Sequence, residues 1–242
     1  MPAQTVKIKS GTGGEFDCYL ALPSGADNVP AVVLASAVHG VDKDLRAIAD
    51  VFAAHGVIAA APDLFWRTIP GPLTRADGEK TTARSQPRGE KVKTGEADMA
   101  DTLRFLRTLK PFNGRAAAMG FCYGGPYAIL GPKRLGYAAG ISCHGSRMQD
   151  YVGELDGVAA PLCIIWGDDD HQAPPDVLAM YRKAAERFGN LELHIFPAVK
   201  HGYMMPDAGA AYDAKTREFS LARALAILDG LRGGGAAMKK AS

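Results

Sequence analysis

The feature that most constrains the fold of this chain is a series of short apolar runs separated by segments with helical periodicity. The first run, Pro30 to Ser36, reads PAVVLAS and contains no charged residue. Runs without polar alternation are typical of strands buried on both faces of a parallel sheet. Other short strand-like runs follow at residues 57–61, 115–119, 138–142, 161–166 and 191–196. The alternation of strand and helix predicts an α/β fold with a mostly parallel central sheet and helices on both faces.

Two further strand-like runs precede this alternation. Residues 5–10 and 16–22 are joined by residues 11–14, three of which are glycines. This pattern predicts an N-terminal antiparallel hairpin. Helices are predicted where apolar residues recur at spacings of three and four, and after the glycine-rich turn near residue 124. These predicted helices cover residues 41–52, 96–109, 124–130, 177–188 and 221–228.

Residues 66–96 interrupt this order. They are rich in Arg, Lys, Thr, Gly and Pro and show little periodicity. We therefore expect a long loop at the edge of the sheet, with a short helical piece at most. Loops of this length inside a compact domain tend to be functional, so this segment is a candidate wall of a binding pocket.

Length and charge narrow the classes of protein further. The 242 residues are expected to form a single domain over 1–242, with residues 233–242 as a frayed tail. A net charge of +2 gives no electrostatic argument for a nucleic acid or an anionic membrane as the partner. The sequence has neither a transmembrane run of apolar residues nor a signal-peptide pattern, which predicts a cytoplasmic protein.

The four cysteines Cys18, Cys122, Cys143 and Cys163 lie far apart. They form no CxxC pair and no zinc-ligand spacing, so no metal site is predicted. In a chain of this length without a signal sequence, reduced thiols are expected. Cys18, Cys143 and Cys163 lie within strand runs and are interpreted as buried structural residues.

Cys122 differs because it lies in the stretch AMGFCYGG, residues 118–125, between a strand and a helix. The glycines on either side permit a sharp turn that would expose the sulfur above the sheet. The N-terminus of the following helix is expected to lower the pKa of the thiol by favouring the anion. We therefore interpret Cys122 as a nucleophile rather than a small buried apolar residue.

A thiol nucleophile needs a base, and the base needs a residue that orients it. In α/β-hydrolases the order along the chain is nucleophile, acid, histidine. His201 follows the last strand run, and the acidic cluster 168–170 lies between it and Cys122, so both occur in this order. The residues alone do not select one of the three aspartates. His144 and His171 are candidates for residues lining the cleft, whereas His55 and His194 are interpreted as structural.

The chain resembles the dienelactone hydrolase family of the α/β-hydrolase fold over about residues 15–230. Four motifs carry the resemblance, namely GFCYGG at 120–125, APDLF at 61–65, GDDDHQAP at 167–174 and HGY at 201–203. In that family the third motif contains the triad aspartate in the pattern Gly-x-x-Asp, which corresponds to Asp170. The resemblance thus implies a triad of Cys122, Asp170 and His201. It also implies an oxyanion hole formed by the backbone N–H groups of Val38 and Tyr123.

The sequence departs from this family at two positions. Family members that bind a carboxylated lactone have an acid where this chain has Ala37, so activation of the thiol is left to His201, the helix N-terminus and Ser36 or His39. They also use two arginines, of which one matches Arg67 and the other falls at Met205. With one arginine replaced by an apolar side chain, the substrate is expected to be less anionic or bulkier than a dienelactone. Residues predicted to bind substrate are Arg67, His39 and Met205.

These features together predict a cysteine-nucleophile hydrolase of carboxylic esters or lactones, of the carboxymethylenebutenolidase type, acting through an acyl-thioester. No cofactor is predicted, because the chain has no GxGxxG after a strand and no P-loop. The expected partner is a small-molecule ester or lactone, and the expected state is a monomer or weak homodimer. Two alternatives remain: a binding protein with weak or no catalysis on the same fold, and a redox-sensing thiol at Cys122.

Overall fold

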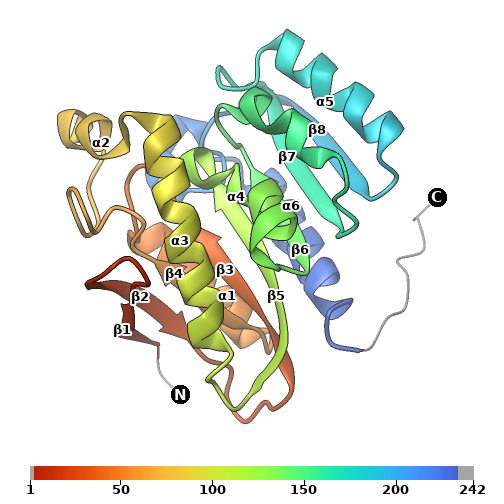
Figure 1. Ribbon diagram of the computed structural model, residues 1–242. Coiled ribbons are helices and arrows are strands. Elements are labelled where there is room, and N and C mark those ends of the chain that lie inside the picture. The colour runs from red at the N-terminus through yellow and green to blue at the C-terminus, as the bar shows by residue number, and fades with distance from the viewer. Residues whose placement is uncertain (1–2, 234–242) are drawn as a thin grey trace.

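A computed structural model describes residues 3–233 as an eight-stranded sheet covered by helices on both faces (Figure 1). The strand order is β1-β2-β4-β3-β5-β6-β7-β8. The strands are β1 (Gln4–Lys9), β2 (Glu15–Ala21), β3 (Val29–Ala35), β4 (Ile58–Pro62), β5 (Phe112–Phe121), β6 (Ala139–Cys143), β7 (Leu162–Asp169) and β8 (Leu191–Lys200). Every strand expected from the sequence is present.

The sheet is mostly parallel, as predicted. The parallel part of the sheet runs in the order β4, β3, β5, β6, β7 and β8. In contrast, β1 pairs antiparallel with β2, and β2 pairs antiparallel with β4. The first two strands form the predicted N-terminal hairpin. Because the parallel strands all point the same way, the residues that follow them gather along one edge of the sheet, where ligands bind in such folds.

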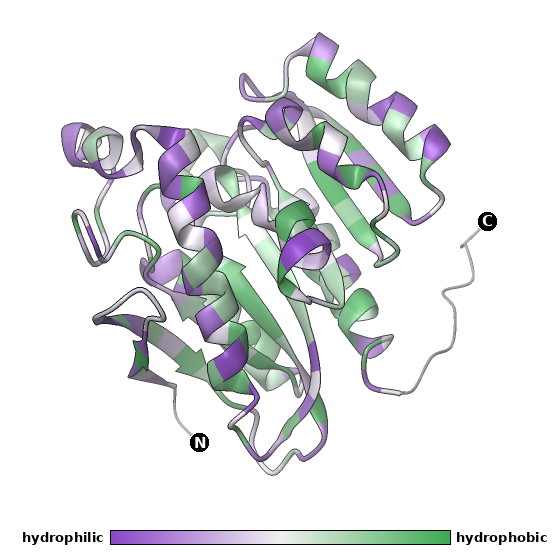
Figure 2. Ribbon diagram, viewed as in Figure 1, coloured by the Kyte–Doolittle hydropathy of each residue, from purple (hydrophilic) through white to green (hydrophobic). Residues whose placement is uncertain are grey.

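Two helices cover one face of the sheet and three cover the other. Side chains alternate along β3, so Val32 and Leu34 pack against α1 and α6, while Ala31 and Val33 pack toward α3. The strands form the apolar centre in Figure 2, and α3 presents polar residues outward. The helices are α1 (Lys43–Ala54), α2 (Gly78–Ser85), α3 (Arg88–Leu106), α4 (Tyr127–Leu130), α5 (Pro175–Arg187) and α6 (Ala214–Asp229), joined by short helical turns η1 (Cys122–Gly124), η2 (Gly131–Leu135), η3 (Met148–Leu155) and η4 (Pro206–Ala211).

The prediction of a long loop over residues 66–96 is wrong. The segment contains helix α2 and the first turns of helix α3, which begins at Arg88 rather than at the predicted residue 96. The buried face of α3 includes Gly95 and Asp98, so apolar periodicity is weak there. Gly95 is required by packing, since a Cβ at this position would lie 2.0 Å from the Tyr127 hydroxyl oxygen.

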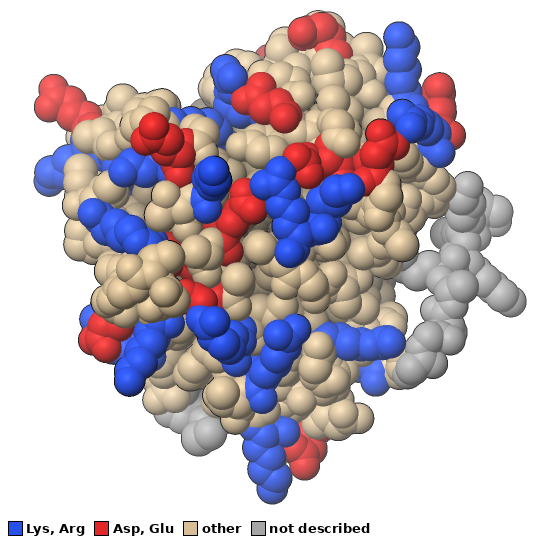
Figure 3. Space-filling model, viewed as in Figure 1, with Lys and Arg blue, Asp and Glu red and all other residues tan. Residues whose placement is uncertain are grey.

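The surface carries charges of both signs. On the face drawn in Figure 3, acidic side chains lie beside basic ones, and Arg134 forms ion pairs with both Glu96 and Glu154. Within residues 3–233, no helix is long and apolar enough to cross a bilayer. The tail predicted to fray, 233–242, lies outside the described residues except for its first position.

Candidate active site

Cys122 lies in a tight turn directly after β5. Its backbone φ is 49°, a left-handed value that a non-glycine residue rarely adopts. Two glycines make the turn possible: a Cβ on Gly120 would lie 2.0 Å from the Gly124 carbonyl oxygen, and one on Gly124 would lie 2.2 Å from the Ala35 carbonyl oxygen. The close approach of β5, the turn and β3 therefore depends on glycine at both positions. Such strained turns store conformational energy and occur preferentially at functional sites.

His201 and Asp170 are joined by hydrogen bonds at the ends of two neighbouring strands. Asp170 follows β7 and His201 follows β8, and His201 Nδ1 lies 2.9 Å from each Asp170 carboxylate oxygen. The Asp170 side chain is fully buried, and the Gln172 N–H donates to it at 2.8 Å. Asp168 instead accepts a hydrogen bond from the Ala198 N–H at 2.7 Å. The contact to His201 thus distinguishes Asp170 from the other two aspartates.

The thiol of Cys122 and the imidazole of His201 change each other's pKa. Burial alone would raise the pKa of Cys122, but the charge of His201, a hydrogen bond to it and the charge of Arg88 outweigh burial and lower it. Burial would lower the pKa of His201, but the charge of Cys122 and the hydrogen bond to Asp170 raise it to about 10. These opposite shifts favour the thiolate–imidazolium pair over the neutral thiol and imidazole.

The helix behind Cys122 differs from the predicted one. The chain forms the short turn η1, then the four-residue helix α4, then the turn η2. Gly125, Pro126 and Gly131, which link these segments, have right-handed helical backbone, so the helical stretch behind Cys122 continues to Leu135. The groups that lower the pKa of Cys122 are His201, Arg88 and Ser146.

Ser146 and Arg88 are contacts of the site that the sequence reasoning missed. Ser146 Oγ lies 3.9 Å from Cys122 Sγ, and an Arg88 Nη2–H donates to the backbone oxygens of Tyr123 and Ser146. Ser146 could have been predicted from its position in the chain, because it follows β6 and β6 is the direct neighbour of β5 in the sheet. Ser36, expected as a possible activating residue, has a buried hydroxyl without a hydrogen-bond partner.

Two further histidines contact His201. The His144 ring packs edge-on against it at 5.0 Å between centroids, and the His171 ring lies at 5.1 Å. His144 is buried, and neither of its ring nitrogens has a hydrogen-bond partner. Burial and the charge of His201 lower the pKa of His144 well below its ordinary value, so its imidazole is neutral.

The two predicted oxyanion-hole residues lie on segments that pack together. Val38 follows β3, Tyr123 follows Cys122, and the close contact of Ala35 with Gly124 joins these segments. Arg84 anchors the Val38 segment, because its buried guanidinium donates to the carbonyl oxygens of Val38, Ile69 and Gly71. The structure thus brings the two backbone positions to the same end of the sheet.

The three residues predicted to bind substrate have different surroundings. Arg67 pairs with the buried Asp98 at 2.6 Å, and it lines a groove of about 550 Å³ that includes neither Cys122 nor His201. Met205 is buried in the apolar core beside α6. His39 is half-buried, and burial together with nearby arginines lowers its pKa.

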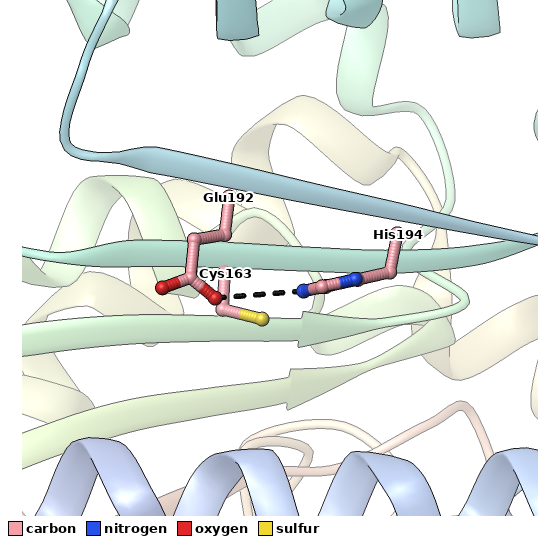
Figure 4. Close-up of side chains that lie close together, drawn as sticks. All are labelled: Cys163, Glu192 and His194. Carbon is pink, nitrogen blue, oxygen red and sulfur yellow. Dashed lines mark hydrogen bonds and ion pairs between the residues drawn. The ribbon is translucent and has the colours of Figure 1, made fainter. Parts of the chain in front are cut away.

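Only one group within the described residues has three side chains that could together ligate a metal. Cys163, Glu192 and His194 extend from β7 and β8 with their ligand atoms within 4.8 Å of one another (Figure 4). Arg223 of α6 donates to both carboxylate oxygens of Glu192, and burial raises the pKa of Cys163 far above its ordinary value. A cation would have to displace Arg223 and deprotonate this thiol, so we interpret the group as an ion-pair network between β8 and α6.

A mostly parallel sheet with a strained turn after its central strand is the architecture of the α/β-hydrolase class. The sequence model of the dienelactone hydrolase family matches residues 16–231. The chain belongs to this family and is a hydrolase of the ester and lactone type.

Known relatives support both the fold and the family. Carboxymethylenebutenolidase 1 of Cupriavidus pinatubonensis is 27% identical over 230 residues, which cover 94% of this chain and 97% of the relative. A dienelactone hydrolase structure from Anabaena variabilis has a TM-score of 0.67 at 19% identity and covers 95% and 97% of the two chains. The phosphorylated esterase 2 of Thermogutta terrifontis has a TM-score of 0.72 at 18% identity and covers 98% and 96%. The predicted family and fold class are confirmed.

Proposed function

We propose that this protein hydrolyses carboxylic esters or lactones with Cys122 as the nucleophile and an acyl-thioester as the intermediate. The observation that carries the proposal is the position of His201 between two groups. Its Nδ1 is hydrogen-bonded to the buried Asp170, and its charge and hydrogen bonding shift the pKa of the Cys122 thiol. A nucleophile, a base and an orienting carboxylate in this order form a catalytic triad.

The chemistry follows from these roles. His201 holds the proton of Cys122, and the thiolate attacks the carbonyl carbon of the substrate. The developing oxyanion accepts hydrogen bonds from the N–H groups of Val38 and Tyr123. His201 then gives its proton to the leaving alkoxide, and a water molecule activated by His201 hydrolyses the thioester to release the acid. Asp170 fixes the imidazole tautomer and stabilises the imidazolium.

The surroundings of the arginines favour a neutral acyl group over a carboxylated one. Arg67 forms an ion pair with Asp98, and Arg84 and Arg88 each donate to backbone carbonyl oxygens. Met205, where the resemblance places a second arginine, is buried in the core. A free carboxylate on the substrate would therefore lack the bidentate arginine partner that recognises it best. Arg75 is the basic residue to test as an exception, because its charge acts on both His39 and His144.

A hydrolysis panel tests the proposal. Purified protein is assayed with an activated neutral aryl ester, a neutral lactone and a carboxylated dienelactone, and kcat/KM is compared among them. We expect measurable hydrolysis with the neutral substrates preferred, and no effect of Arg67→Ala on that preference. A strong preference for the dienelactone that disappears in Arg67→Ala or Arg75→Ala would overturn our account of the pocket.

The intermediate is tested directly. Protein mixed with excess activated ester and quenched in acid should carry one acyl group on Cys122 by peptide mass spectrometry, and Cys122→Ala should carry none. Acyl label on another residue would contradict the nucleophile assignment.

We further propose that the whole catalytic apparatus lies in one domain and acts as a monomer or weak homodimer.

A further inference from the structure

The thiol of Cys122 has no acidic neighbour at the end of β3, because position 37 is alanine. A thiolate in a half-buried position needs hydrogen-bond donors or positive charge to remain ionised, since burial by itself favours the neutral thiol. His201 supplies one such interaction. Residues on the other sides of the turn supply two more interactions of this kind.

Ser146 is the first of these. It lies three residues beyond β6, is 4% exposed, and places its hydroxyl oxygen 3.9 Å from the Cys122 sulfur. Its own N–H donates to the Cys122 carbonyl oxygen at 2.9 Å. The backbone contact fixes the serine against the turn, so its hydroxyl stays beside the sulfur.

Arg88 is the second. As the first residue of α3, it donates from Nη2 to the Tyr123 carbonyl oxygen at 3.0 Å and to the Ser146 carbonyl oxygen at 2.9 Å. Its guanidinium also stacks on the Tyr123 ring at 4.6 Å. Within residues 3–233 it forms no ion pair with a carboxylate, so its charge is not neutralised locally. Its buried Nε has no hydrogen-bond partner.

We propose that Ser146 and Arg88 form a thiolate-stabilising clip, in which the Ser146 hydroxyl donates to the Cys122 thiolate and Arg88 positions Ser146 against the turn. Ser146 is then a catalytic residue, because it contacts the reacting sulfur, and Arg88 is a positioning residue. When the Cys122 proton moves to His201, the Ser146 O–H turns toward the anionic sulfur without transferring its own proton. This clip performs the role left open by the alanine at position 37.

The inference rests on Cys122 being the proposed nucleophile, but its test does not require turnover. The rate of Cys122 alkylation by iodoacetamide is followed from acidic to alkaline pH by peptide mass spectrometry, which reports the thiolate fraction directly. We expect Ser146→Ala to move the midpoint upward by about one pH unit, because a charge-assisted hydrogen bond to the thiolate is lost. Arg88→Gln should also move the midpoint upward.

Matched variants separate the clip from general destabilisation. Ser85→Ala removes another buried serine hydroxyl, one that donates to the Thr82 carbonyl oxygen, and Arg147→Gln removes an exposed arginine next to Ser146. Both should alkylate Cys122 with the wild-type midpoint. If Arg88→Gln does not fold, Arg88→Lys keeps the charge and should shift the midpoint less than Ser146→Ala does.

The outcomes distinguish this inference from the proposed function. A wild-type midpoint in Ser146→Ala overturns the clip even if the protein is an efficient esterase. A raised midpoint supports the clip even if every ester tested is inert, in which case the proposed hydrolysis is what fails. An equal shift in Arg147→Gln and Arg88→Gln would remove Arg88 from the clip and leave a general effect of charge.

Discussion

Within residues 3–233 the protein contains two groups of a cysteine, a histidine and a carboxylate, and they differ in their place in the sheet, in their backbone and in the pKa of the thiol. Cys122, His201 and Asp170 follow the carboxyl ends of β5, β8 and β7. Cys163, Glu192 and His194 lie within the strands β7 and β8 (Figure 4). The first cysteine is in a strained left-handed turn, whereas the second is in extended backbone buried against α6.

The two groups also differ in what holds the carboxylate. Asp170 is buried and bonded to His201, so its charge acts on the imidazole. Glu192 is held by Arg223, and this hydrogen bond lowers its pKa. The pKa of Cys122 is lowered and that of Cys163 is raised. The same residue types thus give a thiol with a lowered pKa at the end of a strand and one with a raised pKa inside the sheet, because burial and partners decide the thiolate fraction.

The largest expected difference concerns the two cysteines. Cys122→Ala should lower kcat/KM for an activated ester by on the order of 10³-fold or more, because the proposed nucleophile is lost. Cys163→Ala, its matched control, should keep wild-type kcat/KM at a temperature where it remains folded by circular dichroism. Activity that survives in Cys122→Ala but not in Cys163→Ala would reverse the comparison.

The next largest expected difference is between substitutions of the two carboxylates, Asp170 and Glu192. Asp170→Asn should lower kcat by about 10²–10⁴-fold, because an amide does not fix the imidazole tautomer or stabilise the imidazolium. Glu192→Gln should leave kcat unchanged, since Glu192 is bonded to Arg223 and His194 rather than to His201. Steady-state kinetics on the folded variants measures both effects, and similar losses in the two would contradict the division of roles.

The pH dependence should separate the two thiols. Because the pKa of Cys122 is lowered and that of His201 is raised, the thiolate–imidazolium pair exists between these two values. Activity should therefore fall at low pH as the thiolate gains a proton, and at high pH as the imidazolium loses one. In native protein at pH 7, iodoacetamide should label Cys122 and leave Cys163 unlabelled. Labelling of both at equal rates would show that burial does not protect Cys163.

The smallest expected effect concerns Arg223. Arg223→Gln removes the charged partner of Glu192 between α6 and β8, and should lower the free energy of unfolding by about 1 kcal/mol, since the pair is only partly buried. Urea denaturation measures this change, with the exposed pair of Arg187 and Asp156 as the control through Arg187→Gln. We expect unchanged ester hydrolysis, and a large loss of activity would indicate that the second group supports the first.

Much of the fold could be predicted because strand and helix periods are local properties of the sequence. The strand-like runs located every strand, and the glycines around Cys122 located the turn. The early start of α3 could not be predicted, because its first turns bury Gly95 and pack against Tyr127 rather than presenting an apolar stripe. Periodicity finds a helix only where burial follows hydrophobicity.

The proposed site also has a part that the sequence predicts and a part that it does not. The chain order of Cys122, Asp170 and His201 is written in the sequence, and strand ends are where such residues are expected. The ion pair between Arg67 and Asp98 joins residues 31 positions apart in the chain. A charged residue in a basic segment gives no local signal of its partner, because ion pairs form between positions that only folding brings together.

The sequence by itself determined the sheet, the strained turn and the order of the three residues proposed for catalysis, since each depends on short-range patterns. Only the tertiary structure decided which neighbours the thiol has. Ser146, which follows β6, contacts the Cys122 sulfur, and Arg88 of α3 donates to the neighbouring Tyr123 and Ser146 carbonyl oxygens; neither lies in a motif. The pKa of a thiol depends on charges and donors within a few ångströms in space, and the position of those groups follows from packing rather than from residue spacing.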